Sequence, residues 1–285
     1  MTSWRAYYRL TKPGIVYGNA LSAIAGFLLA SYGHPYIPTF LGMLVGVSLV
    51  MASACVFNNY LDRDIDDLMA RTKGRALVTG EIPAHNALAY GTALLFAGVV
   101  LLVTLTNPLT ALVAVFGHIA YVFMYGIAKR KTVHGTVIGS ISGAVPPVVG
   151  YVAVTNQLDV LAGLLFLALV FWQMPHFYAI AVFRLRDYQN AGIPVLPAVR
   201  GIERTKIETL WYVAAFIVTV TLMTILGYTG YTFLVVMLVL STHWLYLVSH
   251  RTVTDDALWA RHIFKFSLWI LLAFCLMASL DAYLP

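Results

Sequence analysis

Long apolar stretches recur along the whole chain, separated by short polar segments. Nine of these stretches are predicted as membrane-spanning helices, because about 20 mainly apolar residues cross the hydrocarbon core of a bilayer. Their expected ranges are 14–32, 38–59, 84–105, 108–128, 136–154, 159–181, 207–228, 231–249 and 262–283. Turn-forming sequences such as Gly33-His34-Pro35 and Asn107-Pro108 separate them. The pattern predicts an all-α fold, a polytopic bundle of nine transmembrane helices.

Composition supports a membrane protein. The 285 residues are 60% hydrophobic and 11% charged, with a mean hydropathy of +0.82, whereas a soluble domain carries roughly 25% charged residues. The period-2 alternation of an outer-membrane barrel is absent from the sequence, so helices are expected to satisfy the backbone inside lipid. We expect residues 1–285 to form a single intramembrane domain.

The basic residues predict the orientation in the membrane. Nine alternating spans place all 18 Lys and Arg residues on one side. They form five groups: Arg5, Arg9 and Lys12; Arg63, Arg71, Lys73 and Arg75; Lys129, Arg130 and Lys131; Arg184, Arg186, Arg200, Arg204 and Lys206; Arg251, Arg261 and Lys265. The positive-inside rule makes this side cytoplasmic, with the N-terminus inside and the C-terminus outside, in the periplasm. Topology and anionic lipid headgroups account for the net charge of +6, so no nucleic-acid partner is expected.

The first apolar stretch follows basic residues, as in a signal peptide. However, it shows no clear cleavage pattern, and further spans follow immediately. We therefore expect a retained first helix. A long Arg/Ser-rich leader is also absent from the sequence, which favours the bacterial inner (cytoplasmic) membrane over an imported organelle protein.

An acidic cluster follows the second predicted span, in the stretch "FNNYLDRDIDDLM" at 57–69. If this span continues as a helix, Asn58, Asp62 and Asp66 fall at i, i+4 and i+8 on one face, whereas Asp64 and Asp67 point elsewhere. Their oxygens suit Mg²⁺, which substrate phosphates usually help to coordinate. The alternative is a solvated helix end neutralised by nearby Arg and Lys. The cluster adjoins a membrane span, where acidic residues are costly and usually functional, which favours the metal site.

The loop after the sixth span has the complementary charge. Its sequence, "FRLRDYQNAGIPVLPAVRG" at 183–201, places Asp187 between Arg184, Arg186 and Tyr188. One carboxylate among several guanidinium groups suits a phosphate that is held jointly by a metal and by Arg. Alternatively, the basic residues of this loop only determine the membrane orientation, and the loop itself is a turn. Together the two loops predict a diphosphate bound with Mg²⁺ at the membrane surface, its hydrocarbon tail inside the bundle. Breaking a carbon–diphosphate bond requires neutralisation of the leaving anion.

Four stretches resemble the UbiA-type intramembrane prenyltransferases, in particular their protohaem IX farnesyltransferase (haem O synthase) branch. They are "LTKPGIVYGN" at 10–19, "NNYLDRDIDDLMARTKGR" at 58–75, "GSISGAVPPVVGY" at 139–151 and "MPHFYAIAVFRLRDYQNAGIPVLPAVRG" at 174–201. The similarity extends over essentially the whole chain. It implies a nine-helix fold with both Asp-bearing loops on the cytoplasmic side.

The resemblance also implies residue roles. Asp62, Asp66 and Asp187 would be catalytic and, with Asn58, would hold Mg²⁺. The residues implied to bind the diphosphate are Asn58, Arg71, Arg75, Lys131, Arg184, Arg186 and Tyr188. Two positions depart from the wider superfamily and leave fewer carboxylate ligands: Asn59 stands where many members have Asp, and Ala191 stands where a DxxxD motif would end.

The implied reaction joins the farnesyl group of farnesyl diphosphate to a vinyl group of protohaem IX, with addition of water. It yields haem O and diphosphate, for haem-copper terminal oxidase biogenesis. His176 is the candidate haem ligand, although a histidine at a helix end more often packs through hydrogen bonds. The expected partners are farnesyl diphosphate, protohaem IX and membrane lipid; association with haem A synthase or with terminal oxidase assembly stays open. The alternatives are a prenyltransferase for an aromatic quinone precursor and, more remotely, a cation or proton transporter.

Overall fold

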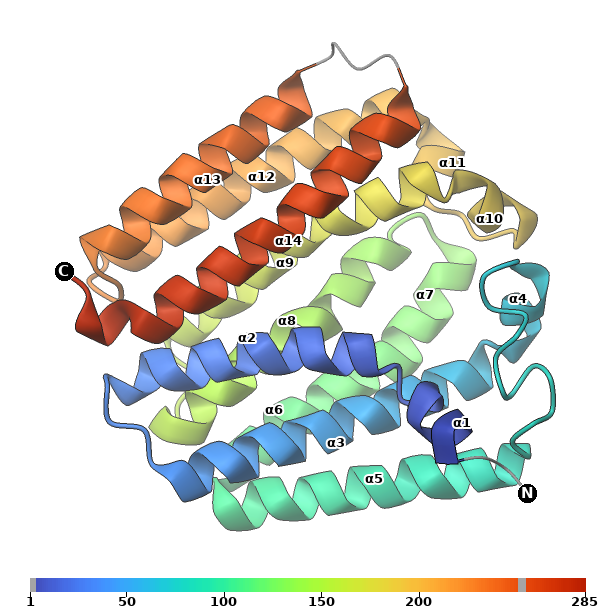
Figure 1. Ribbon diagram of the computed structural model, residues 1–285, viewed down its shortest axis with the longest axis horizontal. Coiled ribbons are helices and arrows are strands. Elements are labelled where there is room, and N and C mark those ends of the chain that lie inside the picture. The colour runs from blue at the N-terminus through green and yellow to red at the C-terminus, as the bar shows by residue number, and fades with distance from the viewer. Residues whose placement is uncertain (1–3, 251–254) are drawn as a thin grey trace.

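The computed structural model describes residues 4–250 and 255–285, and all regular secondary structure in these two ranges is helical (Figure 1). Nine helical segments of the described chain are long and apolar enough to cross a membrane. They are α2 (Pro13–Ser31), α3 (Ile37–Leu61), α5 (Ala84–Leu105), α6–η1–α7 (Pro108–Lys131), α8 (Gly135–Thr155), α9 (Val160–Phe183), α12 (Ile202–Ile225), α13 (Tyr231–Ser249) and α14–η2 (Asp256–Tyr283). The predicted nine-span fold is confirmed, while Arg251 of the last basic group lies outside the described residues.

Two spans begin earlier than predicted. Helix α12 starts at Ile202 instead of 207, and α14 starts at Asp256 instead of 262. Their first turns are too polar to read as membrane spans, but ion pairs and a cap stabilise them as helix. Lys206 pairs with Glu203 at 2.9 Å and with Asp256 at 2.7 Å. The Asp255 carboxylate accepts a hydrogen bond from the Ala257 N–H at 2.8 Å, which satisfies a donor at the start of α14.

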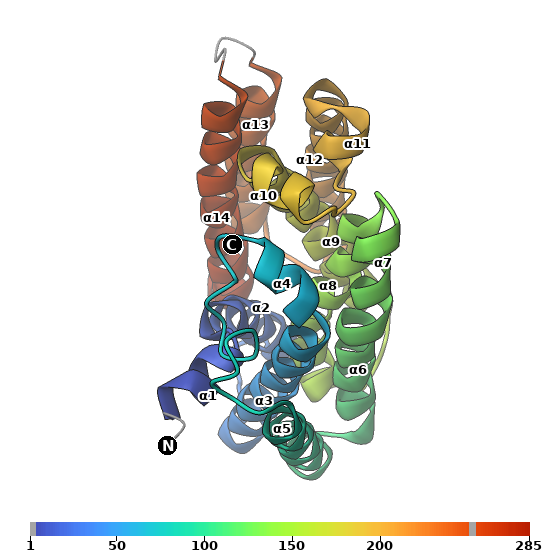
Figure 2. The same ribbon diagram turned by 90° about the vertical axis from the view of Figure 1, so that its right-hand side faces the viewer.

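Short helices gather at one end of the bundle, which we call the site end. They are α1 (Trp4–Leu10), α4 (Arg63–Leu68), α7 (Gly126–Lys131), α10 (Leu185–Asn190) and α11 (Leu196–Arg200). Figure 2 looks onto this end and shows α4, α7 and α10 around its centre. Helix α1, the first described element, lies at the site end and the C-terminus lies toward the opposite end, as an odd number of spans requires (Figure 1).

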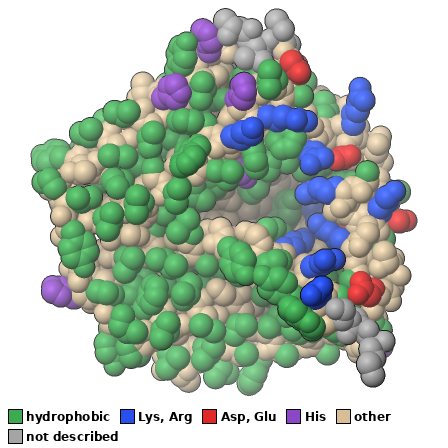
Figure 3. All heavy atoms as spheres, in the orientation of Figure 1, with side chains coloured by type: hydrophobic (Ala, Val, Ile, Leu, Met, Phe, Trp, Pro, Cys, Tyr) green, Lys and Arg blue, Asp and Glu red, His purple; other side chains and the backbone are tan. Residues whose placement is uncertain are grey.

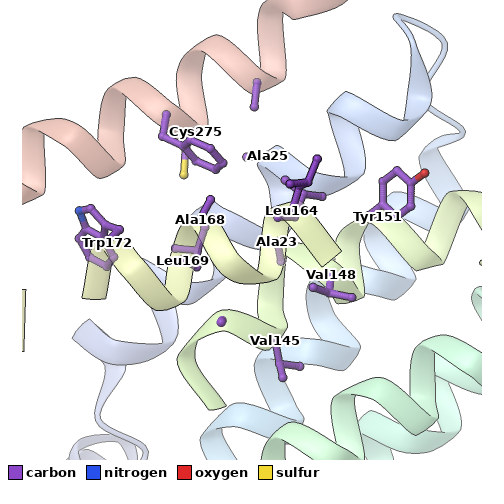
Figure 4. Packing of buried hydrophobic residues seen from close by; sticks show 14 of the residues in the cluster. Ala23, Ala25, Val145, Val148, Tyr151, Leu164, Ala168, Leu169, Trp172 and Cys275 are labelled. Atoms are coloured by element: carbon purple, nitrogen blue, oxygen red, sulfur yellow. The ribbon is translucent and has the colours of Figure 1, made fainter. Parts of the chain in front are cut away.

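Small residues allow α2 and α8 to pack closely. A Cβ atom added to Gly150 would lie 1.9 Å from the Ala23 carbonyl oxygen, and one added to Gly26 would lie 2.0 Å from the Pro147 carbonyl oxygen. Close packing of small residues drives helix association in lipid, where hydrophobic burial between helices gives little advantage. Figure 4 shows the neighbouring core, in which Ala23 and Val148 lie near residues of α9 and α14. This core fixes the helices that surround the site.

Candidate functional site

A cavity of about 630 Å³ lies inside the bundle and reaches the site end. Most of its walls come from α2, α3, α4, α8, α9 and α14 and from the segment containing η1 (Ala120–Tyr125). The volume falls within the range of roughly 300–1,000 Å³ that is usual for ligand sites. Figure 3 shows a hollow on one face of the molecule, with Lys and Arg side chains along its right-hand rim and hydrophobic side chains over most of the remaining surface. The site thus has a charged end and an apolar interior.

The acidic stripe predicted from the sequence lines the charged end. Asn58, Asp62 and Asp66 all border the cavity and are buried, Asp66 to 2% exposure. Helix α3 ends at Leu61 and α4 begins at Arg63, with Asp62 between them. The helical hydrogen-bond spacing nevertheless continues, because the Asp62 N–H donates to the Asn58 carbonyl at 2.9 Å and the Asp66 N–H donates to the Asp62 carbonyl at 2.8 Å. The three side chains therefore stay on one face.

Each of these three residues has a cationic partner from another part of the chain. Lys12 Nζ donates to Asn58 Oδ1 at 2.6 Å, Lys129 Nζ donates to Asp62 Oδ2, and Arg75 Nη1 donates to Asp66 Oδ2 at 2.5 Å. Pairing of this kind offsets the large cost of burying charge. Two polar atoms of the stripe, Asn58 Nδ2 and Asp62 Oδ1, are buried without a hydrogen bond to any described residue. Arg130 Nη2 lies 3.6 Å from Asp62 Oδ1, which is longer than a hydrogen bond. The stripe can therefore accept a further ligand.

Lys12 is a site residue that the sequence reasoning counted only among the orientation-determining charges. It lies between α1 and α2 with φ of +52°, and Pro13 follows it as the first residue of α2. Burial lowers the pKa of Lys12 to about 8. Asn59 helps to hold this turn, because its Nδ2 donates to the Leu10 carbonyl at 2.8 Å. A carboxylate could not donate this bond, so the departure from the superfamily Asp at this position has a structural role.

The three basic residues at the end of the fourth span, Lys129, Arg130 and Lys131, differ in their contacts. Lys129 reaches Asp62, and Arg130 makes two hydrogen bonds to Asp64, at 2.7 and 2.8 Å. These bonds lower the pKa of Asp64 to about 2, although its side chain is 64% exposed and points away from the stripe. Lys131, which the sequence suggested for the diphosphate, is exposed and does not line the cavity. The helical phase of α7, which the sequence alone did not show, places Lys129 and not Lys131 at the cavity.

The second loop contributes less to the cavity wall than expected. Tyr188 of α10 lines the cavity, and burial raises the pKa of its phenol. Asp187, Arg184 and Arg186 do not line it, and Asp187 lies 3.8 Å from Arg184. Within residues 4–250 and 255–285, no three His, Cys, Asp or Glu side chains come together as a metal site. The structure thus joins Asn58, Asp62 and Asp66 but leaves Asp187 apart from them.

The basic residues of the first loop extend the charged wall. Arg71 and Arg75 both line the cavity, as the diphosphate assignment requires. Thr72, between them, is buried, and its hydroxyl donates to the Asp66 carbonyl at 2.9 Å. This bond ties the loop back to α4 and keeps both guanidinium groups beside the stripe.

Aromatic rings line the cavity next to the charged end. Tyr121 and Tyr125 stack with ring centroids 5.6 Å apart, and Lys129 Nζ lies 5.0 Å from the Tyr125 ring centroid. Both tyrosines belong to η1, a π-helical turn, and such turns are frequent at functional sites. Sequence reasoning missed them, because their spacing is equally typical of an ordinary lipid-facing helix. Their π-faces can stabilise positive charge.

Two histidines also line the cavity. His118 is buried, with Nε2 lying 3.1 Å from Ser53 Oγ. His176, the candidate named from the sequence, lies in α9, and its Nδ1 is 2.8 Å from Ser267 Oγ of α14. Trp172 stacks on the His176 ring at 5.1 Å between centroids. The sequence-based placement of His176 near the second loop is consistent with this position.

Comparison with known proteins gives the family. The UbiA prenyltransferase family matches residues 19–278. Protoheme IX farnesyltransferase 2 of Pseudomonas fluorescens is 50% identical over 285 residues, covering 99% of this chain and 97% of the relative. Protoheme IX farnesyltransferase of Yersinia pseudotuberculosis is 50% identical, covering 97% of this chain and 95% of the relative.

Solved structures share the fold. A structure of digeranylgeranylglyceryl phosphate synthase superposes with a TM-score of 0.80 at 21% identity, covering 98% of this chain and 99% of that one. A UbiA homologue from Archaeoglobus fulgidus, bound to DMAPP and Mg²⁺, gives 0.68 at 16% identity, covering 96% and 98%. The nine-span architecture, the cavity with its charged end and the match over residues 19–278 agree: the chain belongs to the UbiA prenyltransferase family.

Proposed function

We propose that this protein transfers the farnesyl group of farnesyl diphosphate to a vinyl group of protohaem IX, with addition of water, to give haem O and diphosphate. The observation that carries the proposal is one cavity with a buried acid–base cluster at its charged end and apolar, aromatic walls beyond it. A diphosphate with a hydrocarbon chain fits a cavity that has one charged end and apolar walls beyond it. The acceptor is assigned from the farnesyltransferases that share 50% identity over nearly their whole length.

The diphosphate would lie against the cations of the charged end. Lys12, Arg71, Arg75 and Lys129 all line the cavity there. When the C1–O bond of farnesyl diphosphate breaks, the electron pair leaves with the diphosphate, and these side chains neutralise the charge that develops on it. Arginine guanidinium groups can bind phosphate oxygens through two hydrogen bonds at once, whereas lysine acts as a point charge.

We propose Mg²⁺ as the cofactor, held by Asn58, Asp62 and Asp66; Asp187 of α10, which does not line the cavity, is not part of this ligand set. The residues fit such an ion: they offer hard oxygen donors, and Asp62 Oδ1 is buried without a hydrogen bond to any described residue. The UbiA homologue from Archaeoglobus fulgidus, which shares the fold, was solved with Mg²⁺ and DMAPP and with Mg²⁺ and GPP. The ion, when bound, would act as a Lewis acid on the diphosphate. The lysine and arginine partners of the stripe would then be available to the diphosphate itself.

The remaining steps form the new carbon–carbon bond. The π electrons of the haem vinyl group bond to C1 of the farnesyl cation. Water adds to the resulting benzylic-type cation and releases a proton, which leaves a hydroxyl group. The rings of Tyr121, Tyr125 and Trp172 line the cavity and can stabilise the cationic species while the apolar walls limit access of water.

The position of the acidic residues disfavours a transporter. Asp62 follows the last residue of α3, and Asp66 lies in α4, outside the membrane spans. A proton or cation pathway would place carboxylates near the bilayer midplane. We also propose residence in the bacterial inner membrane with the site end in the cytoplasm, because the basic residues of the sequence are confined to that side.

Membranes of a host that lacks haem O, expressing this chain, test the function. Supplied with farnesyl diphosphate and Mg²⁺, they should convert haem b to haem O, detected in haem extracts by chromatography and mass spectrometry. Prenylation of 4-hydroxybenzoate or a naphthoate acceptor without haem O would instead establish the quinone-precursor alternative. Ion flux in liposomes that depends on Asp62, with no prenyl transfer, would establish the transporter.

A further inference from the structure

The hydrogen bonds around His176 favour the tautomer that is protonated on Nδ1. The Ser267 hydroxyl donates its only proton to the Phe264 carbonyl at 2.7 Å. The same oxygen lies 2.8 Å from His176 Nδ1, and with the hydroxyl proton directed to Phe264 it accepts this bond from Nδ1–H. Nε2 therefore keeps its lone pair. A histidine whose other ring nitrogen donates to a fixed acceptor is the arrangement found in metal-ligating histidines.

Two aromatic side chains also pack against the His176 ring. Trp172 stacks on it at 5.1 Å between centroids, and Phe264 lies at 4.8 Å. Trp172 is anchored in turn, because its Nε1 donates to the Ser267 carbonyl at 2.7 Å. His176 lines the cavity, and its Nε2 has no hydrogen-bond partner among the described residues, yet it is not one of the buried polar atoms closed off from solvent. A rigid, oriented lone pair is thus available at the apolar part of the site.

Two cations lie on α14, the helix that also supplies Ser267 and Phe264 to the surroundings of His176. Arg261 and Lys265 lie at i and i+4, so they share one face with Leu268, which lines the cavity. Lys265 follows Phe264, the ring packed against His176. Both cations are exposed at the edge of the cavity and do not themselves line it, and neither makes an ion pair or hydrogen bond with any described residue. Figure 3 shows basic side chains above the hollow, next to the group along its right-hand rim.

We propose that these residues form the site of the acceptor substrate: His176 Nε2 ligates the iron of protohaem, and Arg261 and Lys265 bind its two propionates. The inference rests on the proposed function and extends it to the second substrate. In protohaem IX the propionates occupy one half of the macrocycle and the vinyl groups occupy the other half. Anchoring the propionates at the α14 rim therefore turns the vinyl half into the cavity. A single protein ligand suits a haem that must leave as product.

Ferric haem titrated into the purified protein, without farnesyl diphosphate, tests the iron ligand. The wild-type protein should give the absorption spectrum of histidine-ligated haem. The His176→Ala variant should lose this spectrum and regain it with added imidazole, while still binding inorganic diphosphate. His243→Ala, a change at an exposed histidine of α13 outside the cavity, should leave the spectrum unchanged. Ser267→Ala should weaken binding and Ser267→Thr should restore it.

Chemically modified porphyrins separate the two contacts. The Arg261→Gln/Lys265→Gln variant should bind haem about tenfold more weakly for each cation removed. It should bind haem dimethyl ester, which lacks the carboxylates, as well as the wild type does. Metal-free protoporphyrin IX should be insensitive to His176→Ala but sensitive to the double variant.

Two outcomes would overturn the inference while leaving the function intact. They are an unchanged haem spectrum in His176→Ala, and equal weakening of haem and its dimethyl ester by the double variant, each in a protein that still makes haem O. Failure of the wild-type protein to bind any haem would instead contradict the proposed function.

Discussion

Lys12 and Asn58 are 46 residues apart in sequence, yet Lys12 Nζ donates a 2.6 Å hydrogen bond to Asn58 Oδ1 inside the cavity. This contact joins the turn before the first span to the end of the second. It depends on a left-handed backbone at Lys12 and on the bond from Asn59 to the Leu10 carbonyl. The charged end of the site is therefore assembled from the N-terminal segment as well as from the acidic loop.

Replacing Lys12 by Gln should raise KM for farnesyl diphosphate by about tenfold, because one cation facing the diphosphate is lost. The measurement is the dependence of haem O formation on farnesyl diphosphate concentration. Lys73→Gln provides the control, since Lys73 is exposed at the same end and does not line the cavity. Equal effects of the two changes would show that only the general positive charge matters.

The two kinds of aspartate in the acidic cluster should respond differently to neutralisation. Asp62→Asn should lower turnover by more than roughly 100-fold, because a buried oxygen donor of the proposed Mg²⁺ site is lost. Asp64→Asn should change it little, since Asp64 points outward to Arg130 and exposed pairs contribute little. Initial rates with chelator and with restored Mg²⁺ complete the measurement. Full activity of Asp62→Asn, or activity indifferent to chelation, would remove the metal assignment.

Within the run Lys129-Arg130-Lys131, the structure predicts that the first lysine matters most. Lys129→Met should cost more activity than Lys131→Met, because only Lys129 bonds to Asp62 and borders the cavity. Loss of the ammonium also leaves the buried Asp62 without its closest charge partner, so thermal stability in detergent should fall as well. The opposite order of activities would favour the residue chosen from the sequence.

Close packing of α2 against α8 should be sensitive to a single methyl group. Gly150→Ala places a Cβ 1.9 Å from the Ala23 carbonyl oxygen, so the helices must separate, at a cost of about 1–3 kcal/mol. Gly163→Ala, in α9, meets nothing within 4 Å and should be neutral or slightly stabilising. Thermal unfolding of both variants in the same detergent makes the comparison. Equal melting temperatures would show that the two helices do not approach this closely.

Periodicity and hydropathy were sufficient to predict the spans, because a lipid environment leaves few alternatives to an apolar helix of fixed length. The stripe of Asn58, Asp62 and Asp66 followed from helical spacing alone, and it lines the cavity as expected. The early start of α12 at Ile202 did not follow, because ion pairs such as Lys206 with Asp256 join segments distant in sequence.

Sequence patterns could not predict the cationic partners of Asn58 and Asp62. Lys12 meets Asn58 only through a left-handed turn, and Lys129 instead of Lys131 meets Asp62 because of the phase of one short helix. Both depend on tertiary packing, whereas hydropathy treats every lysine near a span in the same way. The tautomer of His176 likewise depends on Ser267, 91 residues away.

The central claim is farnesyl transfer to haem, and the most direct test is the product itself. Purified protein in lipid nanodiscs would receive protohaem, farnesyl diphosphate and Mg²⁺, and the extracted haem would be analysed by mass spectrometry. We predict a haem whose mass has increased by one farnesyl group and one hydroxyl group, with release of one diphosphate for each haem O formed. Unmodified haem, from protein that prenylates another acceptor under the same conditions, would contradict the account.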